Sequence, residues 1–178
     1  MNKILLSISL LLLVNPSFAG HHETDEKLAK AAHGYHFSDK GDKYEIFPGD
    51  MSMVDIVVNY ANAHNDRDLE AIKNATAEDF KAWLPNGVII NGRAAHAEFL
   101  KEIFATSNQK WEFQWGTANN VVVSDGNDSI EQWVNVGFRT TYTMDGKEII
   151  QQQVHNVYIE NGKIGRIAVH SRRIMPKE

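Results

Sequence analysis

Three polar side chains alternate along one stretch of the sequence in a pattern typical of a binding site. Gln151, Gln153 and His155 occupy every second position of the segment EIIQQQVHNVYIENGKI (148–164). In a β-strand such positions point to the same face, which here also carries Ile149. Amides and imidazoles can hydrogen-bond a ligand, and an imidazole can also exchange a proton near neutral pH. This face is therefore either a wet end of a sheet or the wall of a pocket.

The turn before this strand predicts which residues share its face. Asp145-Gly146 favours a two-residue hairpin loop, because both residue types tolerate positive φ. With that loop, Val136 pairs with His155 and Phe138 pairs with Gln153. A few polar groups within an apolar wall are typical of ligand sites. The predicted substrate-binding wall is therefore Val136, Phe138, Gln151, Gln153 and His155.

The turn after this strand leaves two registers open for the last strand. An unbulged Asn161-Gly162 hairpin places His170 and Arg172 on the pocket face, opposite the two glutamines. Both are then candidate substrate contacts, and Arg172 would favour an anionic ligand. A bulge near Gly165 would exchange the two faces. The residues pointing inward would then be Ile167, Val169 and Ser171.

Helical periodicity precedes the strands and predicts the fold class. Apolar residues recur at helical spacing from about residue 52, on a face that also carries Tyr60 and His64. Asp68 is a candidate cap for a second helix, and a third starts near Arg93. After residue 110 the period changes to two, over strand-like runs separated by turns. Three helices followed by an antiparallel meander predict an α+β domain with the helices packed on one sheet face.

Aromatic residues fall on both sides of the predicted sheet. Trp83, just before the turn at Pro85, is a candidate substrate contact by ring stacking, with core packing as the alternative. The hairpin register puts Trp133 and Tyr158 on the opposite, outer face. An aromatic pair on a mostly polar face predicts an exposed apolar patch there.

The start of the chain is typical of an export signal. Lys3 precedes the apolar run ILLSISLLLLV, and small residues follow at Ser17 and Ala19. The run is too short to span a bilayer stably. We predict a cleaved signal peptide over 1–19, and a mature protein that is periplasmic or secreted and has no stable membrane anchor. Residues 20–49 are polar and predict a tail that packs only in part, through Tyr44, Ile46 and Phe47, before a domain over 50–178.

Composition excludes several classes of function. The chain has 178 residues, 43% of them hydrophobic and 23% charged, which suits one globular domain. A net charge of −5 with no basic cluster argues against a nucleic-acid partner. The absence of cysteine excludes disulfides, thiol catalysis and thiolate metal sites.

Signal cleavage would create one candidate metal site. The mature terminus would read Gly20-His21-His22 and offer a free amine, two backbone nitrogens and an imidazole. A square-planar nitrogen set of this kind suits Cu(II) or Ni(II), with His21 and His22 as the candidate ligands. The alternative is that these histidines lie by chance on a polar tail. No other cofactor is predicted, because the chain carries no HExxH or comparable zinc spacing.

Three short stretches carry a resemblance to a known superfamily. They are NYANAHNDRDLEAI (59–72), NGRAAHAEFL (91–100) and VYIENGKIGRI (157–167). They resemble the first helix pair, the start of the third helix and the penultimate hairpin of the ketosteroid-isomerase branch of the nuclear-transport-factor-2-like, or SnoaL-like, superfamily. The resemblance covers about residues 50–172 and implies a cystatin-like cone of three helices on a curved sheet, with an internal pocket. Members often dimerise through the outer sheet face, so we expect a homodimer here.

The resemblance also implies roles for individual residues. The isomerases use a tyrosine of the first helix as an oxyanion donor, and Tyr60 falls at that position. Their second donor is a protonated carboxylic acid, and His155 falls there. Their catalytic base is an aspartate directly before a proline, where this chain has Leu84 before Pro85. Leucine cannot accept a proton, so the usual isomerase route is missing its base.

Together these observations predict an exported SnoaL-like protein that binds a small, mostly apolar molecule bearing a carbonyl or carboxylate. Tyr60 and His155 would contact its polar end. Isomerase- or cyclase-like proton transfer by His155 is the enzymatic form of this hypothesis. The fold also hosts hydrolases and non-catalytic binders. A non-catalytic carrier and a dimeric interaction module are therefore the alternatives.

Overall fold

The computed structural model describes residues 31–124 and 128–175. The predicted signal peptide and the candidate metal ligands His21 and His22 lie outside these ranges. The elements in chain order are β1 (Gly34–Phe37), β2 (Lys43–Pro48), α2 (Ser52–Asp66), α3 (Leu69–Ala75), β3 (Thr76–Trp83), β4 (Ile89–Asn91), α4 (Arg93–Thr106), β5 (Lys110–Ser124), β6 (Asp128–Met144), β7 (Lys147–Glu160) and β8 (Lys163–Arg173).

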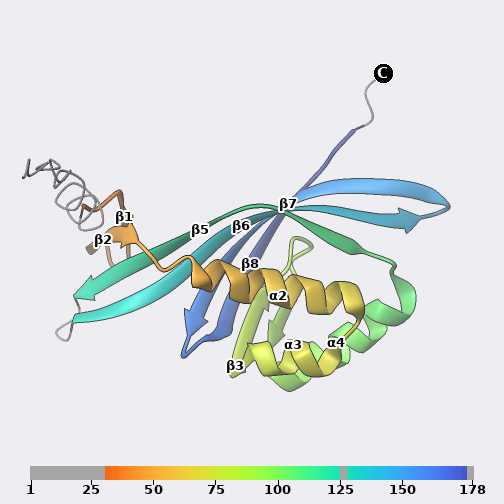
Figure 1. Cartoon of the computed structure of the whole chain (residues 1–178), viewed down its shortest axis with the longest axis horizontal. Coiled ribbons are helices and arrows are strands. Elements are labelled where there is room, and N and C mark those ends of the chain that lie inside the picture. Colours follow the sequence, from red (N-terminus) through yellow and green to blue (C-terminus); the bar gives the residue numbers. More distant parts are fainter. Residues whose placement is uncertain (1–30, 125–127, 176–178) are drawn as a thin grey trace, which may run out of the picture.

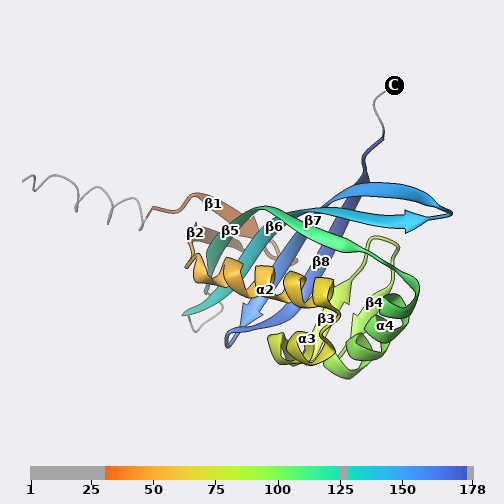
Figure 2. The same cartoon turned by 45° about the vertical axis from the view of Figure 1, so that its right-hand side comes forward.

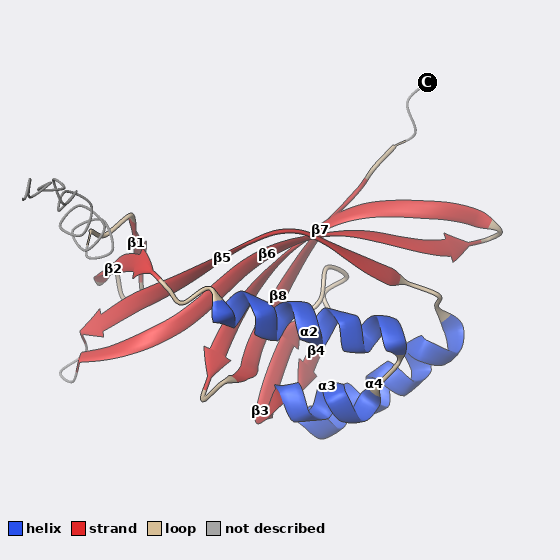
Figure 3. Cartoon of the chain, in the orientation of Figure 1, coloured by secondary structure: helices blue, strands red, loops and turns tan. Residues whose placement is uncertain are grey.

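The strands form one curved sheet in the order β1-β2-β5-β6-β7-β8-β3-β4. Neighbouring strands are antiparallel except for β3 and β8, which run parallel. Helices α2, α3 and α4 all lie on one side of the sheet (Figures 1 and 3). The second view shows α2 crossing the long strands on that side (Figure 2). The predicted α+β fold, with helices on one face of a mostly antiparallel sheet, is confirmed.

The hairpin of β1 and β2 lies within 20–49, the segment expected to be a polar tail that packs only in part. β2 pairs with β5 through Ile46 opposite Val121, so this segment extends the sheet. Tyr44 and Ile46 are half-buried, and the hairpin covers backbone groups of β5 that would otherwise form a free edge. His33 adds a hydrogen bond between its Nε2 and Oδ1 of Asn119, at 3.0 Å. Weak alternation in a polar segment was enough for a strand because a neighbouring strand supplied the partner.

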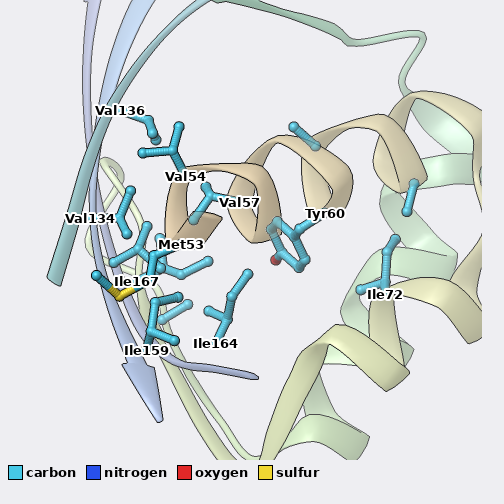
Figure 4. Packing of buried hydrophobic residues seen from close by; sticks show 14 of the residues in the cluster. Met53, Val54, Val57, Tyr60, Ile72, Val134, Val136, Ile159, Ile164 and Ile167 are labelled. Carbon is cyan, nitrogen blue, oxygen red and sulfur yellow. The ribbon is translucent and has the colours of Figure 1, made fainter. Parts of the chain in front are cut away.

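The core lies between the first turns of α2 and the middle of the sheet. Met53 and Val57 of α2 point at the sheet (Figure 4). They meet apolar side chains of β6, β7 and β8, among them Val134, Ile159 and Ile164. Val57, Val134 and Ile164 are completely buried. Burial of aliphatic side chains contributes about 1.5–3 kcal/mol each, so this contact holds α2 across the strands.

The predicted register of β6 and β7 is confirmed. Val136 pairs with His155 and Phe138 pairs with Gln153. Asp145 and Gly146 both have positive φ, 51° and 72°, as the two-residue loop requires.

The register of β8 follows the bulged alternative. Ile159 pairs with Ile164, but Tyr158 pairs with Arg166, which leaves Gly165 as the extra residue. Beyond the bulge Val169 faces His155 and Ser171 faces Gln153, while His170 and Arg172 lie exposed on the outer face. Placing His170 and Arg172 in the pocket was therefore wrong, because one inserted residue exchanges the faces of a strand.

Candidate functional site

A pocket of about 580 Å³ lies between the helices and the inner face of the sheet. Its wall combines residues of α2 and α4, the turn between β3 and β4, and the inner faces of β7 and β8. The structure places Tyr60, Gln151, Gln153 and His155 in this wall. Four of the side chains predicted as polar contacts therefore meet at one cavity, whereas His170 and Arg172 do not line it.

Two predicted contacts, Val136 and Phe138, lie behind the wall instead of in it. Both are buried in the core, with exposed fractions of 0% and 2%. The Phe138 ring lies 5.0 Å from the His155 ring, measured between centroids. These residues therefore pack behind His155. Neither of them lines the pocket, so the predicted contact with a ligand does not fit their positions.

Trp83 lies outside the pocket wall. Its neighbours Ala82 and Leu84 line the pocket, and alternation along the strand turns Trp83 to the opposite side. Its ring is partly exposed and carries the Lys81 ammonium at 5.0 Å from the centroid. The stacking role predicted for Trp83 does not fit this position.

Tyr60 enters the pocket from α2 and is held by a histidine of α4. Its hydroxyl and Nε2 of His96 are 3.2 Å apart, and both residues are buried. His96 in turn stacks on Phe80, with ring centroids 4.4 Å apart. Burial raises the pKa of the Tyr60 phenol well above its ordinary value. Tyr60 therefore stays protonated and remains a hydrogen-bond donor at any physiological pH.

His64 lies one turn after Tyr60, and one nitrogen of its ring carries no proton. Its Nδ1 donates to the Tyr60 carbonyl oxygen at 2.9 Å, so Nε2 carries no proton while the ring is neutral. Burial lowers the pKa of His64 to about 3 and that of His96 to about 4. Both imidazoles are thus neutral near pH 7.

Trp111 forms an aromatic wall beside His64, with ring centroids 4.6 Å apart. The side chain of Asn65 fixes the backbone at this position. Its amide donates to the Trp111 carbonyl oxygen, its carbonyl accepts from the Trp111 amide, and both distances are 2.8 Å. The end of α2 is thereby joined to the start of β5, which sets the position of the indole relative to the helix.

A chain of side-chain hydrogen bonds runs along β7. The Gln151 amide donates to the Tyr142 hydroxyl at 3.2 Å, and the Gln153 amide approaches the Gln151 oxygen at 3.5 Å. His155 Nε2 lies 3.0 Å from the Gln153 oxygen. An amide oxygen only accepts, so the proton of neutral His155 is on Nε2. Alternate residues of a strand share a face, which is why this chain forms.

The second nitrogen of His155 is bare and enclosed. Its Nδ1 is buried without a hydrogen-bond partner among the described residues. Burial, and to a lesser extent the charge of His170, lowers the pKa of His155 to about 4. His155 is therefore a neutral donor to Gln153 and only a weak base.

The pocket residues that were not predicted as site residues include His64, His96 and Arg67. A signal existed for the histidines. His64 follows Tyr60 by four positions, and His96 precedes Leu100 by four, so each shares a helix face with a pocket residue. On α4, Ala95 is exposed and His96 takes the buried position. Arg67 follows the last residue of α2, and periodicity says nothing about such a position.

The lining limits the chemistry available in the pocket. Leu84 is part of the wall, as is Pro85, and no aspartate or glutamate of the described ranges belongs to it. Proton transfer within the wall would thus depend on tyrosine or histidine. Within 31–124 and 128–175, no cluster of three or more histidine, cysteine or acidic side chains is arranged to hold a metal. No helix in those ranges has the length and apolarity to cross a membrane.

Comparisons with known proteins agree with this architecture. The sequence profile of the SnoaL-like domain matches residues 57–167. Among solved structures, a candidate ketosteroid isomerase from Kribbella flavida is 15% identical, with a TM-score of 0.54 over 74% of this chain and 85% of its own. An LEH-like epoxide hydrolase from M. tuberculosis is 12% identical, with a TM-score of 0.55 over 68% of this chain and 84% of its own.

A third similar structure is TerC, which was co-crystallised with polyporic acid. It is 17% identical, with a TM-score of 0.52 over 66% of this chain and 89% of its own. None of the curated protein sequences compared with the chain matches it. At these identities the structural likeness shows the fold alone.

Proposed function

The chain belongs to the SnoaL-like domain family, and we propose that its pocket binds a small, largely apolar molecule bearing a carbonyl or carboxylate group. The observation that carries this proposal is the 580 Å³ pocket itself, whose apolar wall holds Tyr60, His155 and two glutamines. A cavity of a few hundred Å³ with a small number of convergent polar groups is the usual form of a ligand site.

The polar residues would recognise oxygen atoms of the ligand. Tyr60 keeps its proton because burial raises its pKa, and the amides of Gln151 and Gln153 can both donate and accept. Neutral imidazoles add hydrogen bonds without adding charge. The apolar body of the ligand would lie against side chains such as Leu100, Ile103 and Val169.

Acid-base catalysis is the second candidate. It is favoured by the contact of the Tyr60 hydroxyl with His96 at 3.2 Å, a donor coupled to a group that can hold a proton. Isomerase- or cyclase-like chemistry would then use His155 as the acid-base group. A pKa of about 4 makes His155 a weak base near pH 7, and Leu84 supplies no alternative. Ligand binding without catalysis is therefore the function that we favour.

Export and dimerisation complete the proposal. Export rests on the signal-like sequence of 1–19. Dimerisation rests on the outer face, where the rings of Trp133 and Tyr158 lie 5.3 Å apart between centroids. Mass spectrometry of the secreted chain tests for a terminus at Gly20, and sedimentation tests for the dimer.

Thermal unfolding with added ligands tests the pocket. We expect members of a panel of ketones, steroids and aromatic acids to raise the Tm of the protein. Tyr60→Phe should reduce that rise by removing one donor, and Val169→Trp should abolish it by filling the cavity. Tyr158→Phe, on the outer face, is the matched control and should leave the rise unchanged. A rise that survives Val169→Trp would place the ligands outside the pocket and contradict the proposal.

The catalytic candidate has its own readout. Conversion of a β,γ-unsaturated ketone to its conjugated isomer can be followed by ultraviolet absorbance. Turnover that is lost in Tyr60→Phe would support proton transfer in the pocket. Binding with no turnover across the ketones tested would leave the chain as a ligand-binding protein.

A further inference from the structure

The charges around the pocket are distributed unevenly. The chain carries 23 acidic residues and a net charge of −5. Within the described ranges, none of those acidic residues lines the pocket, and Arg67 is its one permanently charged lining residue. The buried imidazoles are neutral near pH 7 because burial lowers their pKa values. The pocket is thus locally positive inside a negative protein.

Arg67 is held at this place by an uncommon backbone conformation. It follows the last residue of α2 with a φ of 61°, in the left-handed region. The amide of Arg67 bonds the His64 carbonyl oxygen and the amide of Asp68 bonds the Ala63 carbonyl oxygen. Glycine or asparagine usually fills such a helix-ending position, because other side chains are strained there. An arginine here therefore costs some free energy relative to glycine.

The guanidinium group is held in place, but only part of its hydrogen-bonding capacity is filled. It lies 4.7 Å from the centroid of the Phe104 ring, and one Nη donates to the Ser107 carbonyl oxygen at 2.6 Å. An arginine has five N–H donors in a planar fork. Among the described residues, no carboxylate forms an ion pair with Arg67. The group is half-buried, so its charge is screened less than on an open surface.

A purely structural role would also be reasonable for this arginine. Ser107 is the C-cap of α4, and Arg67 itself is the C-cap of α2. A cation near helix C-termini stabilises their partial negative charge. That role accounts for the hydrogen bond from Arg67 to Ser107. It does not explain why the other N–H groups of the Arg67 guanidinium have no hydrogen-bond partner among the described residues.

We propose that the ligand is an apolar acid whose anionic group meets Arg67. This inference rests on the proposed function and deepens it by assigning the charge and orientation of the ligand. The acid group would bind the free side of the guanidinium fork through charge-assisted hydrogen bonds. The apolar body would extend past Trp111, and Tyr60 and His155 would meet any further oxygen atom that the ligand carries. Arg67 thereby takes the anion-binding role that the sequence had suggested for Arg172.

Two fluorescent probes of the same skeleton test this proposal. Anilinonaphthalene sulfonate is an anion, and phenylnaphthylamine is its neutral counterpart without the sulfonate, which stands in for a carboxylate. Their dissociation constants would be measured by fluorescence for wild type, Arg67→Gln and Arg67→Lys. Arg172→Gln is the matched control, because it removes the same charge from the outer face. Val169→Trp should abolish the signal of both probes in the pocket.

We expect wild type to bind the anionic probe about tenfold more tightly than the neutral probe, about 1.4 kcal/mol. Arg67→Gln should remove most of that preference, Arg67→Lys should restore part of it, and Arg172→Gln should leave it unchanged. A structural Arg67 would instead weaken both probes equally and lower the Tm. Equal binding of both probes by wild type, or a preference that survives Arg67→Gln, would overturn the anion proposal while the proposed function stands. Binding of neither probe would contradict both.

Discussion

The inner face of β6 and β7 borders two different environments along its length: a packed hydrophobic core and the pocket. Val134 and Val157 face each other in the first, which we call the closed half. Their neighbours there include Met53, Val57 and Ile164, and this half is solidly packed (Figure 4). Thr140 and Gln151 face each other in the second, the open half, which comprises Thr140 and the pocket lining, including Tyr60, His64, His96, Ile103, Trp111, Gln151, Gln153 and His155.

The difference between the halves teaches how a binding site is built without changing the fold. Register and alternation are continuous through both, so the strands alone do not distinguish them. The first turns of α2 cover the closed half with Met53 and Val57, whereas the later turns bring Tyr60 and His64 to a cavity. The polar side chains of β7 bond one another there, whereas Thr140 Oγ1 and His155 Nδ1 are buried without a hydrogen-bond partner among the described residues.

Acid should destabilise the protein through the open half. The imidazoles of His64, His96 and His155 have folded pKa values of about 3, 4 and 4, below the ordinary 6.5. The unfolded chain therefore binds more protons between about pH 4 and 6.5, so stability falls as pH decreases through that window and is unaffected above it. We expect a loss on the order of 4 kcal/mol between about pH 7 and pH 5, measured by urea unfolding.

Removing one of these imidazoles sharpens that result. His64→Leu should reduce the acid-induced loss by about a third, since one of three titrating groups is gone. Equal unfolding free energies for wild type at both pH values would contradict the assignment of buried neutral histidines.

Truncating an isoleucine in each half should separate them by packing. Ile164 is completely buried in the closed half, and Ile164→Ala should cost about 3 kcal/mol through lost burial and a residual cavity. Ile103 lines the pocket and is half-buried, so Ile103→Ala should cost about 1 kcal/mol. Denaturant unfolding measures both, and similar costs would show that the pocket is packed as tightly as the core.

Replacing adjacent glutamines of β7 contrasts the two sheet faces. Gln153→Leu leaves the Nε2 proton of His155 buried without its acceptor, at a cost of about 1–2 kcal/mol. Gln152→Leu, on the exposed outer face, should change stability by less than about 0.5 kcal/mol. Equal losses of unfolding free energy for the two variants, measured in urea, would show that the hydrogen-bond chain along β7 does not stabilise the open half.

Most of the fold followed from local sequence signals. The spacing of Tyr60 and His64 predicted the face of α2, and Asp145-Gly146 predicted the pairing of β6 with β7, because turn geometry fixes the register. Asp68 caps α3 as expected, accepting a hydrogen bond from the Ala71 amide. These features depend on residues close together in the chain.

The residues of the site that were missed depend on contacts between distant segments. Nothing local decides whether Gly165 forms a bulge, yet that bulge turns Arg172 outward. The left-handed conformation that places Arg67 at the pocket occurs at a residue type that rarely adopts it. His96 became a site residue because α4 packs it against Tyr60 of α2. Sequence therefore predicted one wall of the pocket, and the opposing wall required the tertiary structure.

We propose that the open half holds a ligand. The most direct test is an NMR titration of the protein with naphthoate, an apolar aromatic acid, following side-chain amide and indole resonances. We expect the resonances of Gln151, Gln153 and Trp111 to shift together, while Gln152 and Trp115 on the outer face stay unchanged. Shifts confined to Gln152 and Trp115, or no shifts at all with naphthoate and the fluorescent probes alike, would contradict the claim.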